Sequence, residues 1–483
     1  MQKNLLLIYF LFISTIIPNN VTVSMFDESK YEDGYTIFGT LEGKYSAIID
    51  KNGNEIWNSG AKDIVYYNFS NEGRFLGCQF LDDNIYDNYL NSIEFSLCDE
   101  IIWKEPSIEF AHHEILTLPW GNYLGIVSND TIAPLPEGNF GALPFFPFQG
   151  YTTEFPWRYD KIVEWDKDTK EVIWSWSTMD HYSINDFDST LWNMTTLNNK
   201  IIEWTHLNAL YFDKTDSSIY ISSRHLSRIT KINYPSGEII WNLGREMPSG
   251  DVDFGHELGF SWQHSIDFKD GNIIFLDNGN KSENFRGTLY RTTRALEISI
   301  DESSSPPTTE IIWQYDLPEN LFGMASGNVQ KLDNGNYLIT TMGDDGTTLE
   351  ISQTKEIIWS ANYDTPLIYR AHRVPRELID SLLNCTSASI SNHSIPNSFN
   401  LTHLYPNPFN PSINIKYSIE TYSFIYLEIY NLNGELIEKI KADYHIPGHY
   451  EIQWNANTKA SGIYFIRIGD NSNFLSKKII FLK

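Results

Sequence analysis

A short phrase made of an acidic residue, one or two aliphatic residues and a tryptophan recurs along this 483-residue chain. It reads EIW, EVIW or EIIW, and its copies end at Trp57, Trp103, Trp174, Trp241, Trp313 and Trp359. Subtraction gives separations of 46, 71, 67, 72 and 46 residues between successive tryptophans. A pattern that returns at such intervals indicates a repeat architecture, in which each copy forms one supersecondary unit.

Each repeat has the pattern of a small antiparallel sheet. A strand pair joined by a tight turn often precedes the tryptophan phrase, as in HSIDFKDGNIIFLD and GNVQKLDNGNYLITT. Four-stranded units of this size, repeated around a centre, form a β-propeller. The sequence therefore predicts an all-β chain with a six-bladed β-propeller over residues 30–380. A pair of β-sandwiches is the alternative, but its strands would not repeat one tryptophan phrase six times.

The two ends of the chain differ from the repeats. Residues 1–20 carry one early lysine and an apolar run over 5–17, which is too short to span a bilayer and predicts a secretory signal peptide. A short buried strand is the alternative for that run, and no other stretch is long enough for a membrane span. Residues 381–402 are rich in Ser and Asn and predict a linker. Residues 403–483 alternate apolar and polar positions, which predicts a small C-terminal β-sandwich.

Composition bears on several classes of partner and site. The formal net charge of −27 repels phosphate backbones, so we expect no nucleic-acid partner. The three cysteines allow at most one intrachain disulfide, and Cys78 and Cys98 are the pair nearest in sequence. The chain has no CxxC motif and no Cys/His zinc spacing, and we predict neither a metal site nor a cofactor.

Histidines stand where several inner strands begin. His112 or His113 fills this position in FAHHEIL, His206 fills it in WTHLNAL and His264 in WQHSIDF. The first strand of each propeller blade lines the central channel, so residues at these strand starts converge at one mouth. A single histidine at a strand start usually packs or caps, but three at one point of the repeat favour a functional site.

The stretches WTHLNALYFDKTDSSIYISSRHLSRITKI, WQHSIDF and YRTTRALEISID resemble the bacterial arylsulfate sulfotransferases. Members of that family are six-bladed propellers that move a sulfuryl group from one phenol to another without a nucleotide donor. The resemblance implies a phenolic sulfate donor and a phenol acceptor. It agrees with the lack of a phosphate-cradling Gly-rich loop in the sequence.

We predict two sets of site residues, of which the family pattern implies the first. Implied as catalytic are His206, His264 and Arg286, the arginine that follows the DNG turn. Arg294 in RTTRALE is the second match for that arginine, and we predict that His113, Asn208, Arg294 and His372 bind substrate. Arg224 and His225 in SSRHLSR match the family as well, either as support for His206 or as a structural contact within the blade.

One position departs from the family. Its sulfate-accepting histidine has no counterpart in MGDDGTTLEIS, where this chain carries Asp, Gly and Thr. Three outcomes are open: His206 or His264 accepts the group, transfer is direct, or the activity is lost. Two other functions stand beside transfer. One is a non-catalytic propeller that binds a small ligand, glycan or protein, and the other is a sulfatase-like hydrolase.

The motifs YPNPFNP, IYNLNGE and SGIYFIRI resemble the type A C-terminal sorting domain of the type IX secretion system. This resemblance covers residues 403–483. It implies recognition by the type IX secretion machinery and a secreted or cell-surface location.

Overall fold

The computed structural model describes residues 21–69, 73–80, 91–98, 100–106, 110–134, 154–188, 201–383, 399–419, 423–432, 435–445, 448–469 and 474–483. Within these residues, six sheets of four or five strands follow one another, and two further sheets form the C-terminal part. The predicted signal peptide, residues 1–20, and most of the predicted linker, residues 381–402, lie outside the described residues.

The first three sheets, blades 1 to 3, are antiparallel and take their strands in the orders β26-β2-β3-β4, β5-β6-β7-β8 and β9-β10-β11-β12. Blade 1 contains β26 (Ile368–Val374), β2 (Tyr35–Thr40), β3 (Tyr45–Ile49) and β4 (Glu55–Asn58). Blade 2 contains β5 (Ile64–Phe69), β6 (Phe75–Gln79), β7 (Asn91–Phe95) and β8 (Ile101–Lys104). Blade 3 contains β9 (Phe110–Thr117), β10 (Tyr123–Pro134), β11 (Glu154–Trp165), β12 (Val172–Ser177) and the short parallel strand β13 (Ile202–Glu203).

Blades 4 to 6 repeat this arrangement. Blade 4 contains β14 (Leu207–Asp213), β15 (Ser218–Ser223), β16 (Arg228–Asn233) and β17 (Ile239–Gly244). Blade 5 contains β18 (His264–Lys269), β19 (Asn272–Asp277), β20 (Arg294–Asp301) and β21 (Thr308–Asp316). Blade 6 contains β22 (Asn328–Lys331), β23 (Tyr337–Thr341), β24 (Thr347–Ile351), β25 (Ile357–Asn362) and β1 (Thr22–Met25). The helices are short: α1 (Thr178–His181), α3 (Ser282–Phe285), α4 (Arg376–Leu382) and the 3₁₀ turns η1 (Glu42–Lys44), η4 (Ile184–Asp186), η6 (His256–Leu258) and η7 (Glu319–Leu321).

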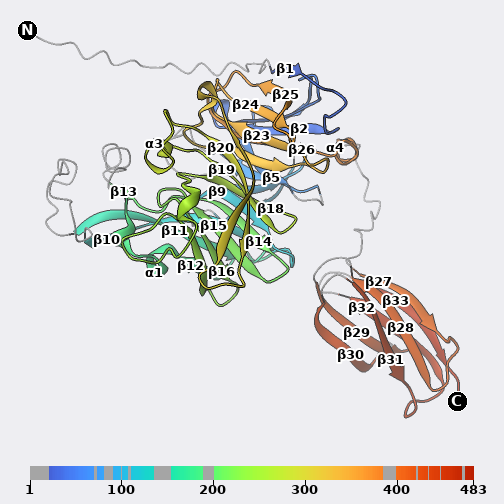
Figure 1. The fold of residues 1–483 in the computed structure, drawn as a ribbon. Helices are drawn as coiled ribbons and strands as arrows, with labels where there is room; N and C mark the ends of the chain where they lie inside the picture. Colours follow the sequence, from blue (N-terminus) through green and yellow to red (C-terminus); the bar gives the residue numbers. More distant parts are fainter. Residues whose placement is uncertain are drawn as a thin grey trace, which may run out of the picture. The chain divides into compact units, whose positions relative to one another are not determined.

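The blades form a closed ring. The first strands of neighbouring blades contact one another, β14 with β18, β18 with β22, and β22 with β26. Figure 1 shows β26 beside β2, although more than 300 residues separate them in sequence, and β26 thereby completes blade 1 as its inner strand. The predicted all-β fold with a six-bladed β-propeller is confirmed.

The tryptophans of the repeated phrase join each blade to the next. Five of these indoles, within the described residues, donate from Nε1 to the turn between the third and fourth strands of the following blade. The acceptors are the Leu97 carbonyl for Trp57 (2.8 Å), Pro235 for Trp174 (2.9 Å), Oε1 of Glu302 for Trp241 (2.7 Å), Gln353 for Trp313 (3.1 Å) and Lys51 for Trp359 (2.9 Å). The sixth, Trp103, stacks on Tyr123 of the following blade at 3.9 Å between ring centroids.

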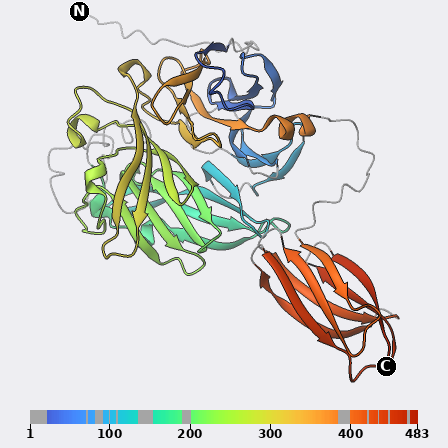
Figure 2. The same ribbon diagram turned by 45° about the vertical axis from the view of Figure 1, so that its right-hand side comes forward.

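The C-terminal part is a β-sandwich, seen in Figure 2 in orange and red. One sheet has the order β27-β28-β31 and the other β30-β29-β32-β33. The strands are β27 (Phe399–Tyr405), β28 (Ser412–Ile419), β29 (Ser423–Asn431), β30 (Leu436–His445), β31 (Gly448–Asn455), β32 (Gly462–Gly469) and β33 (Phe474–Phe481). Alternate side chains of β28 are buried and share one core with β29 and β32, which is the period expected for a strand with one covered face.

Two smaller expectations can be compared with the structure. Cys78 is buried and free, whereas Cys98 is disulfide-bonded, so these two cysteines do not pair. Among the described residues, no helix has the length and apolar character needed to cross a membrane.

Arg373 of β26 lies at the closure of the ring, where blade 6 packs against blade 1. Its guanidinium is buried, lies 3.2 Å from the Glu350 carboxylate of blade 6 and donates to Oγ1 of Thr36 in blade 1 at 3.1 Å. Its planar group also lies over the rings of Tyr31 and Trp359, at 4.2 Å and 5.1 Å from their centroids. One side chain therefore contacts both blades at the closure.

We predict that Arg373→Met lowers the free energy of unfolding by about 3–5 kcal/mol, because Glu350 is then buried without its partner. Arg376→Met is the matched control, since its pair with Asp33 is largely exposed and should contribute less than about 1 kcal/mol. Urea unfolding followed by tryptophan fluorescence measures both variants. Equal and small losses would contradict the role of Arg373 in closing the ring.

Candidate functional site

Three imidazoles gather at one end of the inner strands of blades 3, 4 and 5. His113 lies on β9, His206 immediately precedes β14, and His264 begins β18. The ring centroids of His113 and His206 are 4.7 Å apart, and those of His113 and His264 are 6.2 Å apart. The structure thus brings these three sequence-predicted residues together, while their chemical roles stay predictions.

The backbone that carries these rings is strained. His113 and His206 adopt left-handed backbone angles, with φ of 62° and 48°. A residue other than glycine in this region costs of order 1–3 kcal/mol. The pairing register also shifts just after His206 and His264, at the starts of β14 and β18. Irregular strand starts of this kind re-aim side chains, and they are common beside active sites.

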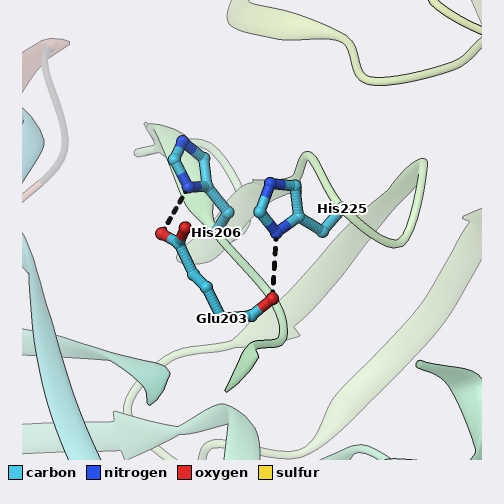
Figure 3. A group of neighbouring side chains, drawn as sticks. All are labelled: Glu203, His206 and His225. Carbon is cyan, nitrogen blue, oxygen red and sulfur yellow. Dashed lines mark hydrogen bonds and ion pairs between the residues drawn. The ribbon is translucent and has the colours of Figure 1, made fainter. Parts of the chain in front are cut away.

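Oxygen atoms fix the orientation of the imidazoles through Nδ1. Nδ1 of His206 lies 2.6 Å from Oε1 of Glu203, and Nδ1 of His225 lies 3.2 Å from the Glu203 carbonyl oxygen (Figure 3). Nδ1 of His264 lies 2.8 Å from the Gly327 carbonyl oxygen. Carboxylate and carbonyl oxygens only accept, so each Nδ1 carries the hydrogen and each neutral ring keeps a lone pair on Nε2. Figure 3 shows Nε2 of His206 and His225 on the side turned away from Glu203.

Glu203 is a site residue that the sequence analysis missed. It ends β13, which pairs in parallel with β11 of blade 3. Burial alone would raise the pKa of its carboxyl, but the charge and hydrogen bond of His206, together with the charge of His225, hold that pKa below its usual value. The group is therefore an anion at neutral pH. Its position three residues before His206 is the one signal in the sequence that pointed to it.

The other imidazoles are neutral at neutral pH. Burial, and then the charge of His206, lowers the pKa of His113 well below its usual value. The same two causes lower the pKa of His225 to about 3. For His264, burial and then the charge of Arg370 lower the pKa. These rings therefore present lone pairs rather than positive charge.

Two buried guanidinium groups accompany the imidazoles. Arg370, on β26, pairs with Glu114 of β9 and donates from Nη2 to the Asn208 carbonyl oxygen at 3.1 Å. Arg224 donates from Nη2 to the Met324 carbonyl oxygen at 3.0 Å. Nε of both arginines is buried and has no hydrogen-bond partner in the described part of the chain. Fixed and unpaired N–H donors of this kind suit an anion.

A cavity of about 650 Å³ opens beside the imidazoles. Its lining comes from the segment that follows β12 of blade 3, which contributes Asp186 and Asp188, and from the loops of blades 4 and 5, which contribute His225, Trp262 and Lys281. Phe285 and Met324 also line it. The ring of His225 stacks on that of His206, with 4.6 Å between centroids. The cavity therefore adjoins the imidazole cluster, which consists of His113, His206, His225 and His264. Its size and its mixture of aromatic and charged side chains suit a small aromatic ligand.

A family model described as arylsulfotransferase (ASST) matches residues 20–370. The chain belongs to the arylsulfotransferase family. A second model, described as a secretion system C-terminal sorting domain, matches residues 403–482. This tail indicates secretion or cell-surface localisation, as the sequence predicted. No curated protein matches the chain.

Solved structures similar to this chain share little sequence with it. A protein of unknown function from Bacteroides caccae is 12% identical, with 70% of this chain and 98% of that chain covered and a TM-score of 0.40. A putative 6-phosphogluconolactonase from Bacteroides uniformis is 9% identical, with 87% and 100% covered and a TM-score of 0.36. PorZ of Porphyromonas gingivalis, a surface component of the type IX secretion system, is 13% identical, with 94% and 53% covered and a TM-score of 0.27.

The structure places Asn208 and His372 in contacts between strands. The Asn208 amide is buried and donates to the Gln263 carbonyl oxygen at 2.7 Å, which ties blade 4 to blade 5. His372 lies between the Tyr66 hydroxyl, 2.9 Å from Nδ1, and the Asn328 amide, 3.2 Å from Nε2. Because both of its nitrogen atoms are engaged, His372 has none left for a substrate. Its predicted substrate-binding role gains no support from this geometry.

In the described part of the chain, the hydrogen bonds and ion pairs of Arg286 lie within blade 5, so its predicted catalytic role gains no support from them. Its guanidinium donates to the Thr292 carbonyl oxygen at 2.6 Å and lies 3.5 Å from Asp277 of β19 and 3.3 Å from Asp316 of β21. Arg294 also pairs with Asp277, at 3.0 Å. The buried Asp277 carboxylate requires positive charge beside it, and it holds both arginines within blade 5.

Glu203, His206 and His225 form the one group in the described residues whose ligand atoms could hold a metal ion, all within 4.8 Å of one another. In a tetrahedral zinc site, ligand atoms about 2.0–2.3 Å from the metal are about 3.4 Å apart. Here the carboxylate already holds Nδ1 of His206, while the two Nε2 atoms lie on the opposite side (Figure 3). These atoms do not converge on one point, so the arrangement favours chemistry at Nε2 over metal binding.

We predict that the fold loses stability through His372 as the pH falls from 7 to 5. Burial, and then the charge of Arg370, lowers the pKa of His372 to about 3, whereas an unfolded histidine has a pKa of about 6.5. The unfolded state therefore takes up a proton first, and stability is lost below pH ~6.5, by about 2 kcal/mol at pH 5.

Urea unfolding at pH 7 and pH 5 measures this effect. His372→Gln should reduce the difference in unfolding free energy between the two pH values by about 2 kcal/mol. His256→Gln, at an exposed histidine outside the cluster, is the control and should behave like the wild type. An unchanged pH dependence in His372→Gln would refute the prediction.

Proposed function

We propose that this arylsulfotransferase moves a sulfuryl group from a phenolic sulfate ester to a phenolic acceptor, with His206 carrying the group between two half-reactions. The observation behind the choice of His206 is its contact with Glu203. The carboxylate takes the hydrogen bond of Nδ1 and leaves Nε2 with its lone pair, on a side chain that is 16% exposed. A histidine oriented by a carboxylate is the usual form of an activated imidazole.

In the first half-reaction, Nε2 of His206 attacks the sulfur of the donor. The N–S bond forms, the bond between sulfur and the phenolic oxygen breaks, and the phenolate leaves with the electron pair. The imidazole gains positive charge as it attacks. The Glu203 carboxylate on Nδ1 stabilises that charge without taking the proton.

Charge that develops on the sulfonyl oxygens needs fixed donors. His264 is a poor donor, because the Gly327 carbonyl holds its Nδ1 hydrogen and leaves Nε2 as an acceptor. The unpaired Nε–H groups of Arg224 and Arg370 are the donors in the described residues that suit this task. A donor aimed at developing charge in a buried site contributes roughly 10²–10³ to the rate.

His264 is the weaker candidate for the sulfuryl acceptor. Its side chain is buried, and a backbone carbonyl rather than a carboxylate holds its Nδ1. A neutral carbonyl stabilises a developing imidazolium less than an anion does. The position of Glu203 therefore favours His206 for the role that the family assigns to a histidine elsewhere.

We predict that His206→Gln abolishes transfer and that Glu203→Gln lowers kcat by roughly 10²–10⁴. A glutamine at position 203 can donate as well as accept, so it permits the tautomer in which Nε2 carries the hydrogen. Release of p-nitrophenolate from p-nitrophenyl sulfate, with and without phenol, measures the reaction. Intact mass after addition of donor alone detects the covalent SO₃ group.

Two results would separate this proposal from its rivals, and one variant serves as a control. A covalent SO₃ group that persists in His206→Gln would assign the acceptor role to another residue. Equal release of p-nitrophenolate without phenol would indicate hydrolysis. Glu302→Gln, a carboxylate on the outer edge of blade 5 that binds Trp241, is the matched control and should leave kcat unchanged.

A further inference from the structure

His225 is an imidazole for which the proposed half-reaction has no use. It lies in the turn between β15 and β16, and its side chain is buried. Its ring stacks on His206 with an interplanar angle of 29°. Of the imidazoles in the cluster, His225 is the one that lines the 650 Å³ cavity, within the described part of the chain.

We propose that His225 is the general base for the phenolic acceptor, which binds in this cavity. The inference rests on the proposed function and adds the residue that serves its second half-reaction. The ring is held through Nδ1 by the Glu203 carbonyl oxygen, so the nitrogen left to meet the acceptor is Nε2 (Figure 3). Nε2 of His206 lies on the same side of Glu203, where the sulfuryl group would be carried.

The cavity lining suits an aryl group beside that nitrogen. Trp262, Phe285 and Met324 supply aromatic and thioether surface, and the Trp262 ring lies 5.9 Å from the His225 ring. Arg224 lies over the Trp262 ring at 4.5 Å from its centroid, and Lys281, which pairs with Asp188, lies over the same ring at 5.7 Å. Positive charge at this position favours a hydroxyl that is becoming a phenolate.

The protons and electron pairs balance over one cycle. The acceptor hydroxyl gives its proton to Nε2 of His225, its oxygen bonds to the sulfur on His206, and the N–S bond breaks with its electron pair returning to Nε2 of His206. In the next first half-reaction, the departing phenolate takes the proton back from His225. Donor and acceptor thus exchange SO₃ and one proton, and the enzyme returns to its starting state.

The charged groups around His225 suit a base that accepts the proton only while the acceptor attacks the sulfur. His206, Glu203 and Arg224 face the ring, and burial lowers the pKa of His225, which keeps the ring unprotonated before substrate binds. A phenolic hydroxyl becomes steadily more acidic as its bond to sulfur forms, and the sulfonyl group adds negative charge beside the ring. Proton transfer then becomes favourable during attack, which is where general base catalysis contributes.

His225→Asn tests the role, because the asparagine amide can keep the hydrogen bond to the Glu203 carbonyl while Nε2 is lost. We expect turnover with phenol to fall by roughly 10²–10⁴, while one equivalent of p-nitrophenolate per enzyme is still released in the first turnover. The sulfated enzyme should accumulate even in the presence of phenol. Acceptors already ionised at the assay pH, such as nitrophenols, should be affected far less, which a merely structural defect would not produce.

His181→Asn is the matched control. Its Nδ1 also lies near a backbone carbonyl oxygen, that of Ser177 at 2.8 Å, and its ring stacks on Trp176, but the residue is exposed and outside the cavity. His225→Gln provides a second variant if the asparagine protein does not fold. Normal turnover of phenol in either variant, or an equal loss with every acceptor and no first-turnover release, would overturn the role of His225. Wild-type protein that never carries SO₃ would overturn the proposed transfer and this step with it.

Discussion

The hydrogen bond from an outer-strand indole to the neighbouring blade is the contact on which this propeller depends. Five of the six repeated tryptophans, within the described residues, make it to the same turn of the next blade, and Trp359 makes it across the closure of the ring. Each bond contributes only about 0.5–1.5 kcal/mol on its own. Repeated around a closed ring, the bonds fix the angle between blades, and therefore the spacing of the inner strands that carry the imidazoles.

Fixed inner strands allow several imidazoles to lie close together without charge. Burial, and then the positive charge of neighbouring groups, lowers the pKa of His113, His225 and His264, at a cost in stability that grows as the pH falls. Glu203 fixes the orientation of two rings of the cluster. Its carboxylate accepts the hydrogen bond from Nδ1 of His206, and its backbone carbonyl oxygen accepts the one from Nδ1 of His225. One residue on a two-residue strand thus holds Nδ1 of two neighbouring rings.

The sequence predicted the structural features that recur from blade to blade, and it missed features that occur in only one blade. Six tryptophan phrases indicated six blades, and the common position of His113, His206 and His264 indicated their meeting, because both follow from the periodicity of the fold. Arg286 was assigned from a turn motif alone, but side-chain pairing decides its direction, and Asp277 holds it in blade 5. Glu203 belongs to a strand outside the four-stranded repeat, so periodicity could not reveal it.

The contact between Glu203 and His206 offers an explanation for the absence of the family's sulfate-accepting histidine from this chain. The proposed transfer needs one imidazole with a free Nε2 and a nearby anion, and these are His206, just before β14 of blade 4, and Glu203, on β13 of blade 3. Burial and neighbouring positive charge suppress protonation of His113, His225 and His264. In the proposed transfer, a bound aryl sulfate would place its negative charge near the unpaired Nε–H groups of Arg224 and Arg370. The proposed reaction would thus use imidazoles to form and accept bonds and guanidinium groups to stabilise the charge on the sulfonyl oxygens.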